Sequence, residues 1–279
     1  MRTYWRVPAI LGLMTIGACG PETCQPGDLA CMERRCEAKA TQACLDLAHA
    51  QWDGAPAAKA DEEKSWNSVK KALAIDSTET RALERAACLE NQALSCLVIK
   101  RMFDRGEGEP KDQRKAIAYA EQACAAGHAE SCLEAARFTL LLDEKAALPL
   151  YEKACGYQSV EGCNMTANTL FLLKEDAKAE AAHEKACGMG SADSCNSLGD
   201  THRGRMEGAN AEQYFLKACE LGNRSSCSSL GLLYRYGTRP SDKAPVQVNL
   251  QKAREFYQRS CNKGGTGDCT AVKELSGSP

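Results

Sequence analysis

Cysteine is the residue type whose number and spacing in this sequence point most directly to chemistry. Seventeen of the 279 residues are cysteine, and fourteen of these form seven pairs with seven residues between the two members. Two thiols that a turn holds within about 6 Å of each other can be oxidised to a disulfide. So many cysteines without metal-site spacing predict an oxidising compartment such as the periplasm or the cell surface. The predicted pairs are Cys36–Cys44, Cys88–Cys96, Cys124–Cys132, Cys155–Cys163, Cys187–Cys195, Cys219–Cys227 and Cys261–Cys269.

Three cysteines lie outside these pairs. Cys24 and Cys31 are close together in the sequence, so we expect an eighth disulfide between them. Cys19 is then the single cysteine left without a partner, and it follows an apolar segment. One special cysteine and eight disulfides therefore account for every thiol in the chain.

The segment before Cys19 has the pattern of a secretory signal peptide, which we expect to span residues 1–18. Two arginines precede an apolar run of about a dozen residues, which is too short for a membrane-spanning helix. Ile16-Gly-Ala-Cys19 resembles the bacterial lipobox, in which the cysteine is acylated and becomes the mature N-terminus. In lipoproteins of this type, a residue such as Gly20 after the cysteine favours the outer membrane. Ordinary signal cleavage with loss of Cys19 stays open as the alternative, because both outcomes leave an even number of cysteines.

The remaining residues give little indication of a metal, a cofactor or a nucleic acid. No Cys-x2-Cys or His-x3-His spacing occurs, so we expect no zinc site, no redox dithiol and no bound cofactor. The four histidines are far apart in the sequence, and we interpret them as packing residues: His49, His128, His183 and His202. The formal net charge is −2, and basic and acidic residues are interleaved, which argues against nucleic-acid binding.

The residues between the cysteine pairs have the spacing of helices. An aromatic residue or histidine stands four positions before the first cysteine of the last four pairs, and small residues recur four positions after the second cysteine. Spacings of three and four residues place such positions on one helical face. We therefore expect one helix to end near the first cysteine of each pair and another to begin near the second. The aromatic or histidine positions are Tyr151, His183, Phe215 and Tyr257, and the small positions are Ala48, Ala136, Ala167, Gly199 and Gly231.

The turn between the two cysteines has its own signal. Three residues after the first cysteine the chain carries Asn91, Gly127, Gly190, Gly222 or Gly264, residue types that tolerate the left-handed conformation at a helix end. In one repeat Gln158 occupies this position instead. A turn of this kind would bring the two cysteines together, so each disulfide is predicted to staple the junction between successive helical hairpins.

The first cysteines recur at intervals between 31 and 42 residues from Cys88 to Cys261, a period typical of helical solenoids. The segments YEKAC, YFLKAC, FYQRSC and CSSLGLLYRYG resemble the SEL-one-like repeat, a tetratricopeptide-type module. With a cysteine pair in each repeat and a secretion signal, the chain resembles the cysteine-rich Helicobacter-type secreted proteins. The resemblance covers the chain from about Cys36 and is strongest over residues 209–275. It implies an all-α fold, a right-handed α-α superhelical solenoid of disulfide-stapled helix-turn-helix repeats.

This interpretation predicts the organisation of the whole chain. Residues 1–18 are the signal peptide, and residues 19–35 are an N-terminal cap or linker. The solenoid of about six repeats spans residues 36–275, with an insertion at 53–76. A short tail, residues 276–279, ends the chain.

The fold implies a binding role. In tetratricopeptide-type folds the first helix of each hairpin lines the concave side, where ligands usually lie. Polar residues that packing does not require there are Arg137, Asn168, Asp200 and Arg235; a solvated helix face is the alternative interpretation of each. We expect an extracytoplasmic scaffold of the bacterial cell envelope, lipid-anchored in the outer membrane or secreted. Its expected partner is an unidentified protein or peptide of the envelope, with the membrane reached through the lipid anchor.

The resemblance also raises an enzymatic alternative, because members of the cysteine-rich family are described as penicillin-binding or β-lactam-hydrolysing. Serine β-lactamases need a Ser-x-x-Lys nucleophile with Ser-Asp-Asn and Lys-Thr-Gly elements. Ser68-Val-Lys-Lys71 matches the first element, and the sequence has neither of the others. We therefore expect no enzymatic activity, with β-lactam hydrolysis as the alternative.

Overall fold

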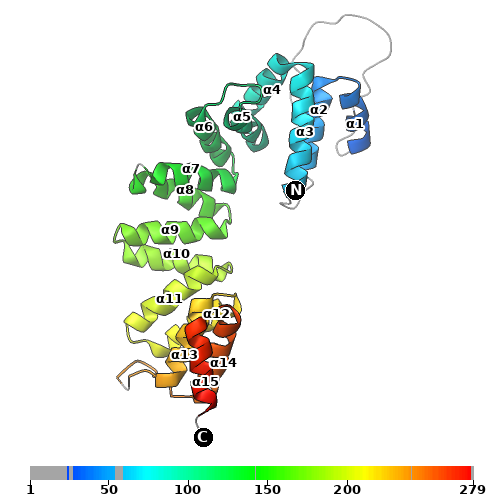
Figure 1. Cartoon of the computed structure of the whole chain (residues 1–279). Coiled ribbons are helices and arrows are strands. Elements are labelled where there is room, and N and C mark those ends of the chain that lie inside the picture. Colours follow the sequence, from blue (N-terminus) through cyan, green and yellow to red (C-terminus); the bar gives the residue numbers. More distant parts are fainter. Residues whose placement is uncertain (1–23, 25–27, 54–58, 142, 240, 278–279) are drawn as a thin grey trace, which may run out of the picture. The chain divides into compact units, whose positions relative to one another are not determined.

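A computed structural model describes residues 24, 28–53, 59–141, 143–239 and 241–277, and within these residues the chain forms fifteen helices and no strand. The chain divides into two compact units, Met1–Ala135 and Ala136–Pro279, and the boundary falls inside α7 (Figure 1). The helices are α1 (Leu29–Glu37), α2 (Thr41–Asp53), α3 (Lys59–Ile75), α4 (Ser77–Leu89), α5 (Ala93–Arg105), α6 (Gln113–Ala125), α7 (Ala129–Leu140), α8 (Glu144–Gly156), α9 (Val160–Leu172), α10 (Asp176–Gly188), α11 (Ala192–Gly204), α12 (Gly208–Glu220), α13 (Arg224–Tyr236), α14 (Leu250–Asn262) and α15 (Thr266–Ser276).

From α4 onward, a disulfide spans every second connection between consecutive helices, and another spans the connection between α1 and α2. A first helix, such as α9 or α11, begins beside the second cysteine of a pair, and a second helix, such as α10 or α12, ends beside the first cysteine of the next pair. Eight bridges have the pairing that the spacing predicts, from Cys24–Cys31 to Cys261–Cys269. Their Cα–Cα distances range from 4.4 to 5.7 Å, within the span that a disulfide allows.

The turn between α12 and α13 shows how the sequence makes these junctions. Gly222 has a left-handed φ of 102°, and its N–H donates to the carbonyl of Cys219 at 3.1 Å. The next N–H, of Asn223, donates to the carbonyl of Ala218 at 2.9 Å, so the last carbonyls of α12 are satisfied. The Asn223 side chain then accepts from the N–H of Ser226 at 2.9 Å and caps α13.

The third residue after the first cysteine keeps the left-handed backbone conformation even where its residue type does not favour it. Gln158 and Lys39, each three residues after the first cysteine of a pair, have φ values of 65° and 63°. The left-handed conformation costs a residue that has a Cβ roughly 1–2 kcal/mol. The repeat geometry and the closed bridge therefore override the local preference at these two turns.

Residues 59–75, within the predicted insertion, form α3, which packs against α2 in the first unit. Trp66 and Val69 are buried in a cluster with Ala48 and Phe103. The hydroxyl of Ser65 donates to the carbonyl of Ala48 at 2.8 Å, which ties α3 to α2. The insertion thus contributes a helix to the core of this unit.

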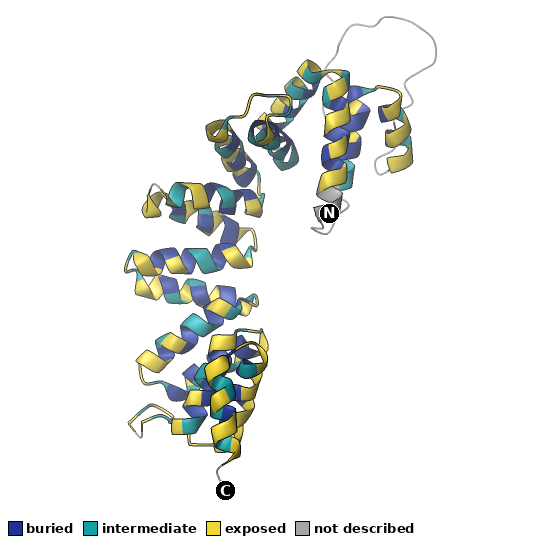
Figure 2. Cartoon of the chain, in the orientation of Figure 1, coloured by how far each residue is buried: buried dark blue, intermediate teal, exposed yellow. Residues whose placement is uncertain are grey.

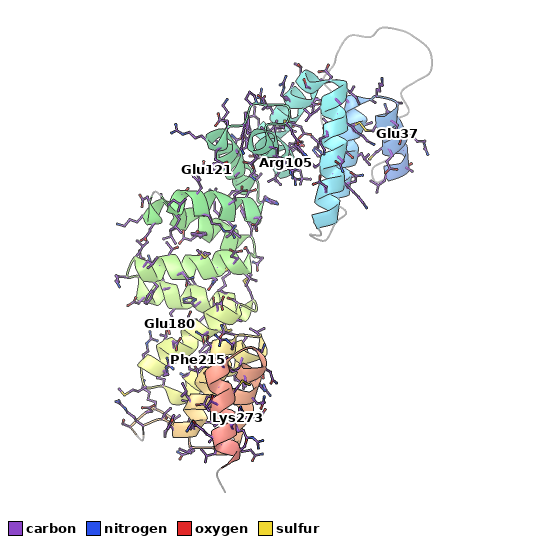
Figure 3. All side chains as sticks on the ribbon, in the orientation of Figure 1. Glu37, Arg105, Glu121, Glu180, Phe215 and Lys273 are labelled. Carbon is purple, nitrogen blue, oxygen red and sulfur yellow. A yellow bond between two sulfur atoms is a disulfide. The ribbon has the colours of Figure 1, made fainter. Side chains whose placement is uncertain are left out.

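In the second unit the aromatic positions pack against the small positions. The rings of Phe215 and Tyr257 are 0% and 2% exposed. A Cβ added to Gly199 or Gly231 would lie 2.5 Å from the nearest ring atom of Phe215 or Tyr257 respectively, so each glycine makes room for one ring. Phe215 is labelled in Figure 3, and Figure 2 shows the buried residues along the sides where paired helices face each other.

The predicted class of fold, an all-α solenoid of disulfide-stapled helical hairpins, is confirmed in the part of the chain described above. The predicted signal peptide and Cys19 lie outside the described residues. The domain boundaries given above for the cap, the solenoid and the tail stay predictions.

Candidate functional site

Successive first helices of the second unit are joined by a ladder of side-chain hydrogen bonds. The hydroxyl of Ser194 on α11 donates to the side-chain oxygen of Asn164 on α9 at 2.7 Å. One repeat later, the hydroxyl of Ser226 on α13 donates to Asn196 on α11 at 2.6 Å. Each bond links the residue before the second cysteine of one repeat to the residue after the second cysteine of the preceding repeat. The ladder fixes the register in which α9, α11 and α13 present their exposed side chains.

The four residues predicted to bind a partner all lie on first helices: α7, α9, α11 and α13. Asn168 on α9 is exposed, and its side chain makes no hydrogen bond within the described residues. Arg137 on α7 donates to the carboxylate of Glu161 at 2.5 Å. Three of the four, Arg137, Asn168 and Asp200, stand five residues after a second cysteine.

The other two predicted residues are held by neighbouring side chains. Asp200 accepts hydrogen bonds from Asn196 at 3.2 Å and Arg203 at 2.6 Å. Arg235, which stands eight residues after its cysteine, donates to Glu274 on α15 at 3.0 Å, and this ion pair raises the pKa of the guanidinium. The structure therefore places the four predicted residues along one series of helices, and no described contact brings any two of them together.

Two grooves flank α13. The first has a volume of about 500 Å³ and lies between the end of α11, α13 and the segment 237–249 that follows α13. The second, of about 350 Å³, lies between α13, α14 and α15 and includes Arg235. Leu232, which is 46% exposed, lines both grooves.

The segment 237–249 is folded back onto the turn between α11 and α12. The N–H of Thr238 donates to the carbonyl of Val246 at 3.0 Å, and the N–H of Val246 donates to the Thr238 hydroxyl at 2.9 Å. The N–H of Lys243 donates to the carbonyl of Met206 at 3.0 Å, and its Nζ lies 3.0 Å from Oε1 of Glu207. These contacts give the first groove a fixed wall.

Glu207 is the most strongly perturbed carboxylate at this wall. Hydrogen bonds from His202 at 2.7 Å and from Lys243 lower the pKa of Glu207 to about 2. The ring of His202 stacks on Tyr214, with 5.1 Å between the ring centres. These contacts hold the helix turn and the segment together.

A buried histidine occupies the aromatic packing position of α10. His183 is 8% exposed, and burial lowers the pKa of its ring. Its Nδ1 has no hydrogen-bond partner within the described residues. In that part of the chain, no three histidine, cysteine or acidic side chains are grouped as metal ligands.

The serine considered for β-lactam hydrolysis is not placed as a nucleophile. Ser68 is 4% exposed, and its hydroxyl donates to Oε1 of Gln51 at 2.9 Å. Lys71, one turn later on α3, is exposed. A buried hydroxyl already bound to an amide oxygen is not available to attack a substrate.

The Sel1 repeat family model matches residues 41–67, 94–128, 208–223 and 225–265. These segments contain first and second helices of both units, with the cysteine junctions described above. These four segments of the chain match the Sel1 repeat. No curated protein gave a significant match to the sequence.

Solved Sel1 repeat structures have the same fold. The crystal structure of c5321, a protective antigen of uropathogenic Escherichia coli with an SLR fold, superposes with a TM-score of 0.64 at 17% identity, over 89% of this chain and 51% of that one. This chain thus spans about half the length of c5321. A Sel1 repeat protein from Oxalobacter formigenes gives a TM-score of 0.53 at 17% identity, over 91% of this chain and 83% of that one.

The grooves beside α13 were not anticipated from the sequence. Met206 and Arg239 line the first groove, but neither occupies a position of the Sel1 repeat frame that we had singled out. A signal for Leu232 was present, because it stands five residues after Cys227, the position that holds Asp200 one repeat earlier. An apolar residue such as Leu232, at a position expected to face solvent, is the sequence signal that could have identified the grooves.

The disulfides of this chain indicate the compartment in which it folds. Eight disulfides fit an oxidising, extracytoplasmic environment. Among the described helices, none is both long enough and apolar enough to cross a membrane.

Proposed function

We propose that this chain is an extracytoplasmic scaffold that binds a protein or peptide of the bacterial cell envelope. The observation that carries the proposal is the eight bridges, one at each repeat junction and one before α1. A bridge that closes a loop of about nine residues contributes roughly 2.5 kcal/mol in the chain-entropy model. Disulfides persist only in an oxidising compartment, which supports the extracytoplasmic part of the proposal. They also stabilise the repeat array without using its exposed helix faces, which leaves those faces for binding.

The proposed binding surface is the exposed side of the first helices in the second unit. It includes the four predicted residues, Arg137, Asn168, Asp200 and Arg235. The hydrogen-bond ladder joins α9, α11 and α13, the helices that carry the last three of them. Arg137 and Arg235 are already paired with carboxylates from the next first helix, so they also join neighbouring repeats. Asn168 is exposed and therefore the best reporter of a bound partner.

Site-specific photo-crosslinking in the native envelope tests the proposal. A photoreactive amino acid at position 168 on α9 should capture a defined envelope protein, which mass spectrometry identifies. The matched control is position 152 on α8, because Glu152 is exposed on a second helix of the same unit. Equal capture at the two positions, or capture at neither, would contradict a partner on the first helices.

We further propose that the mature chain is attached to the outer membrane through a lipid on Cys19. The lipobox-like sequence that ends at this residue supports this attachment. Metabolic labelling with radioactive palmitate should label the wild-type protein and not the Cys19→Ser variant. Secretion of a soluble, unlabelled wild-type protein would instead indicate ordinary signal cleavage.

A further inference from the structure

The first groove beside α13 is a built site with a fixed wall and an apolar floor. We call it the loop groove and define it by Arg203, Met206, Leu232, Leu233, Arg239 and Asp242. Its wall, the segment 237–249, is anchored by the contacts of Thr238 and Lys243 described above. A preformed groove binds without first losing conformational entropy.

The floor of the loop groove belongs to an apolar edge of the second unit. The exposed large apolar side chains of this unit gather where first helices end and second helices begin, and few lie on the edge that carries the disulfides. Met206, Leu232 and Tyr236 are 47%, 46% and 67% exposed. Apolar side chains gathered on one edge indicate an interaction surface. The apolar residues of this edge are Phe138, Leu141, Phe171, Leu172, Met206, Leu232, Tyr236, Val248 and Leu250.

Two guanidinium groups stand at the loop groove. Arg239 is exposed and has no carboxylate partner within the described residues. Within the described residues, Arg203 is paired with Asp200 of its own helix, and both side chains of that pair are about half exposed, at 52% and 45%. The Arg203 guanidinium also lies over the ring of Phe215, 5.5 Å from its centre. Exposed pairs of this kind contribute little and exchange readily. Both arginines can therefore meet a carboxylate of a partner.

Asp242 gives the groove a hydrogen-bond acceptor as well. One oxygen of its carboxylate is shielded from solvent and accepts no hydrogen bond within the described part of the chain. The Asp242 side chain also lines the groove and is partly exposed, so its carboxylate offers an acceptor to a partner that supplies an N–H beside its own carboxylate. A polypeptide carries both groups, because each acidic residue has a backbone N–H next to its side chain.

We propose that the loop groove binds a polypeptide segment in which an aliphatic residue neighbours an acidic residue. The aliphatic side chain lies on Met206, Leu232 and Leu233, and the carboxylate meets Arg239 and Arg203. A lipid surface fits less well, because anionic bilayers attract clusters of basic residues. The loop groove has two arginines, and the negative charge of Asp242 stands beside them. The inference deepens the proposed scaffold function and rests on it for the presence of such a partner.

The test uses fluorescence anisotropy with the full mature protein and three short labelled peptides. One alternates leucine with glutamate, the second has lysine in place of glutamate, and the third has serine in place of leucine. The leucine–glutamate peptide should bind tightest, and its affinity should fall as salt rises. Arg239→Glu and Leu232→Ser should each weaken binding by about fivefold or more, since each removes one of the two contacts.

Matched variants separate the groove from general surface effects. Arg254→Glu alters an exposed arginine on α14, outside both grooves, and Leu221→Ser alters a leucine that is 45% exposed on the disulfide edge. Both should bind as the wild type does. Equal losses in the control and groove variants, tighter binding of the lysine peptide, or binding only to anionic lipid vesicles would overturn the inference.

The crosslinking assay distinguishes failure of the groove from failure of the scaffold. If Arg239→Glu still captures at position 168 as much envelope partner as the wild type, the groove assignment is wrong and the scaffold function stands. If the wild type captures nothing there while the leucine–glutamate peptide still depends on Arg239, the groove stands and the proposed surface is wrong.

Discussion

Replacing Gly231 with alanine tests the packing rule that holds neighbouring repeats together. Gly231 is buried on α13, and a Cβ at this position would lie 2.5 Å from Cδ1 and 2.6 Å from Cε1 of Tyr257 on α14. Real Cβ atoms essentially never approach carbon atoms so closely. Tyr257 is only 2% exposed, so its ring has little free space into which it can move.

The expected loss of stability follows from two opposing effects. Inserting a methyl group into a packed core costs typically about 1–3 kcal/mol. Alanine in a helix interior is favoured over glycine by roughly 1 kcal/mol. Because the contact is so short, we take the upper half of the packing range, and Gly231→Ala should destabilise the second unit by about 1–2 kcal/mol. The hairpin of α7 and α8 carries Ala136 and Tyr151 at the same frame positions, so the variant should still fold.

Thermal unfolding of the oxidised protein, followed by circular dichroism, measures the effect. For a domain of this size the loss corresponds to a midpoint about 2–8 °C lower. Gly204→Ala is the matched control, because Gly204 ends α11 and a Cβ there meets nothing within 4 Å. The control should be as stable as the wild type or slightly more stable. If Gly231→Ala and Gly204→Ala had the same unfolding midpoint, the rule that glycine makes room for the ring would be wrong.

Three further predictions concern the ladder, the bridges and the turn beside the loop groove. Ser226→Ala should destabilise the protein to urea by about 1 kcal/mol, because Asn196 loses its donor, whereas the exposed Ser225→Ala should have no effect. Replacing Cys219 and Cys227 together by serine should cost about 2.5 kcal/mol in the same urea assay. The pKa of Glu207 is about 2 in the folded protein, against an ordinary value of 4.5, so its contribution to stability is present above pH 4.5 and is lost as the pH falls toward 2. Thermal unfolding across that range should therefore change less in Glu207→Gln than in the wild type.

Each of these results has a clear contrary. Equal urea midpoints for the two serine variants would remove the ladder from the account of repeat register. Reactive thiols in the unreduced mature protein would contradict the bridges, and they can be counted by alkylation and mass spectrometry. The same slope of stability against pH in wild type and Glu207→Gln would show that the clamp at the α11–α12 turn is not formed in solution.

The cysteine frame made the junctions predictable from sequence, because the requirement at each position is local. A bridge over eight positions needs a reversal of the chain, and Asn91, Gly127 or Gly222 at the third position supply the left-handed residue. Gln158 broke that pattern in the sequence, yet its φ is 65°. The position in the repeat therefore predicts the backbone conformation better than the residue type does.

The loop groove could not be predicted in the same way, because it depends on non-local contacts. The segment 237–249 is rich in glycine, proline and charged residues, which predicts a loop but not its conformation. Its conformation is fixed by Lys243 bonding to Met206 and Glu207, residues of a different repeat. The serine ladder is an intermediate case, since serine precedes the second cysteine in several repeats, but its partner Asn196 becomes visible only once the helices are placed.

The bridges and the exposed apolar edge have one physical explanation. The interfaces between neighbouring helices are lined largely by alanine, glycine and single rings such as Phe215, so each repeat buries little apolar area. A bridge worth roughly 2.5 kcal/mol replaces about one fully buried leucine side chain, for which burial contributes about 1.5–3 kcal/mol. Stability obtained covalently at one edge leaves large side chains such as Phe171 and Tyr236 exposed at the other, at 59% and 67%. Those side chains are then available for the partner proposed above, while the bridged edge stabilises the array.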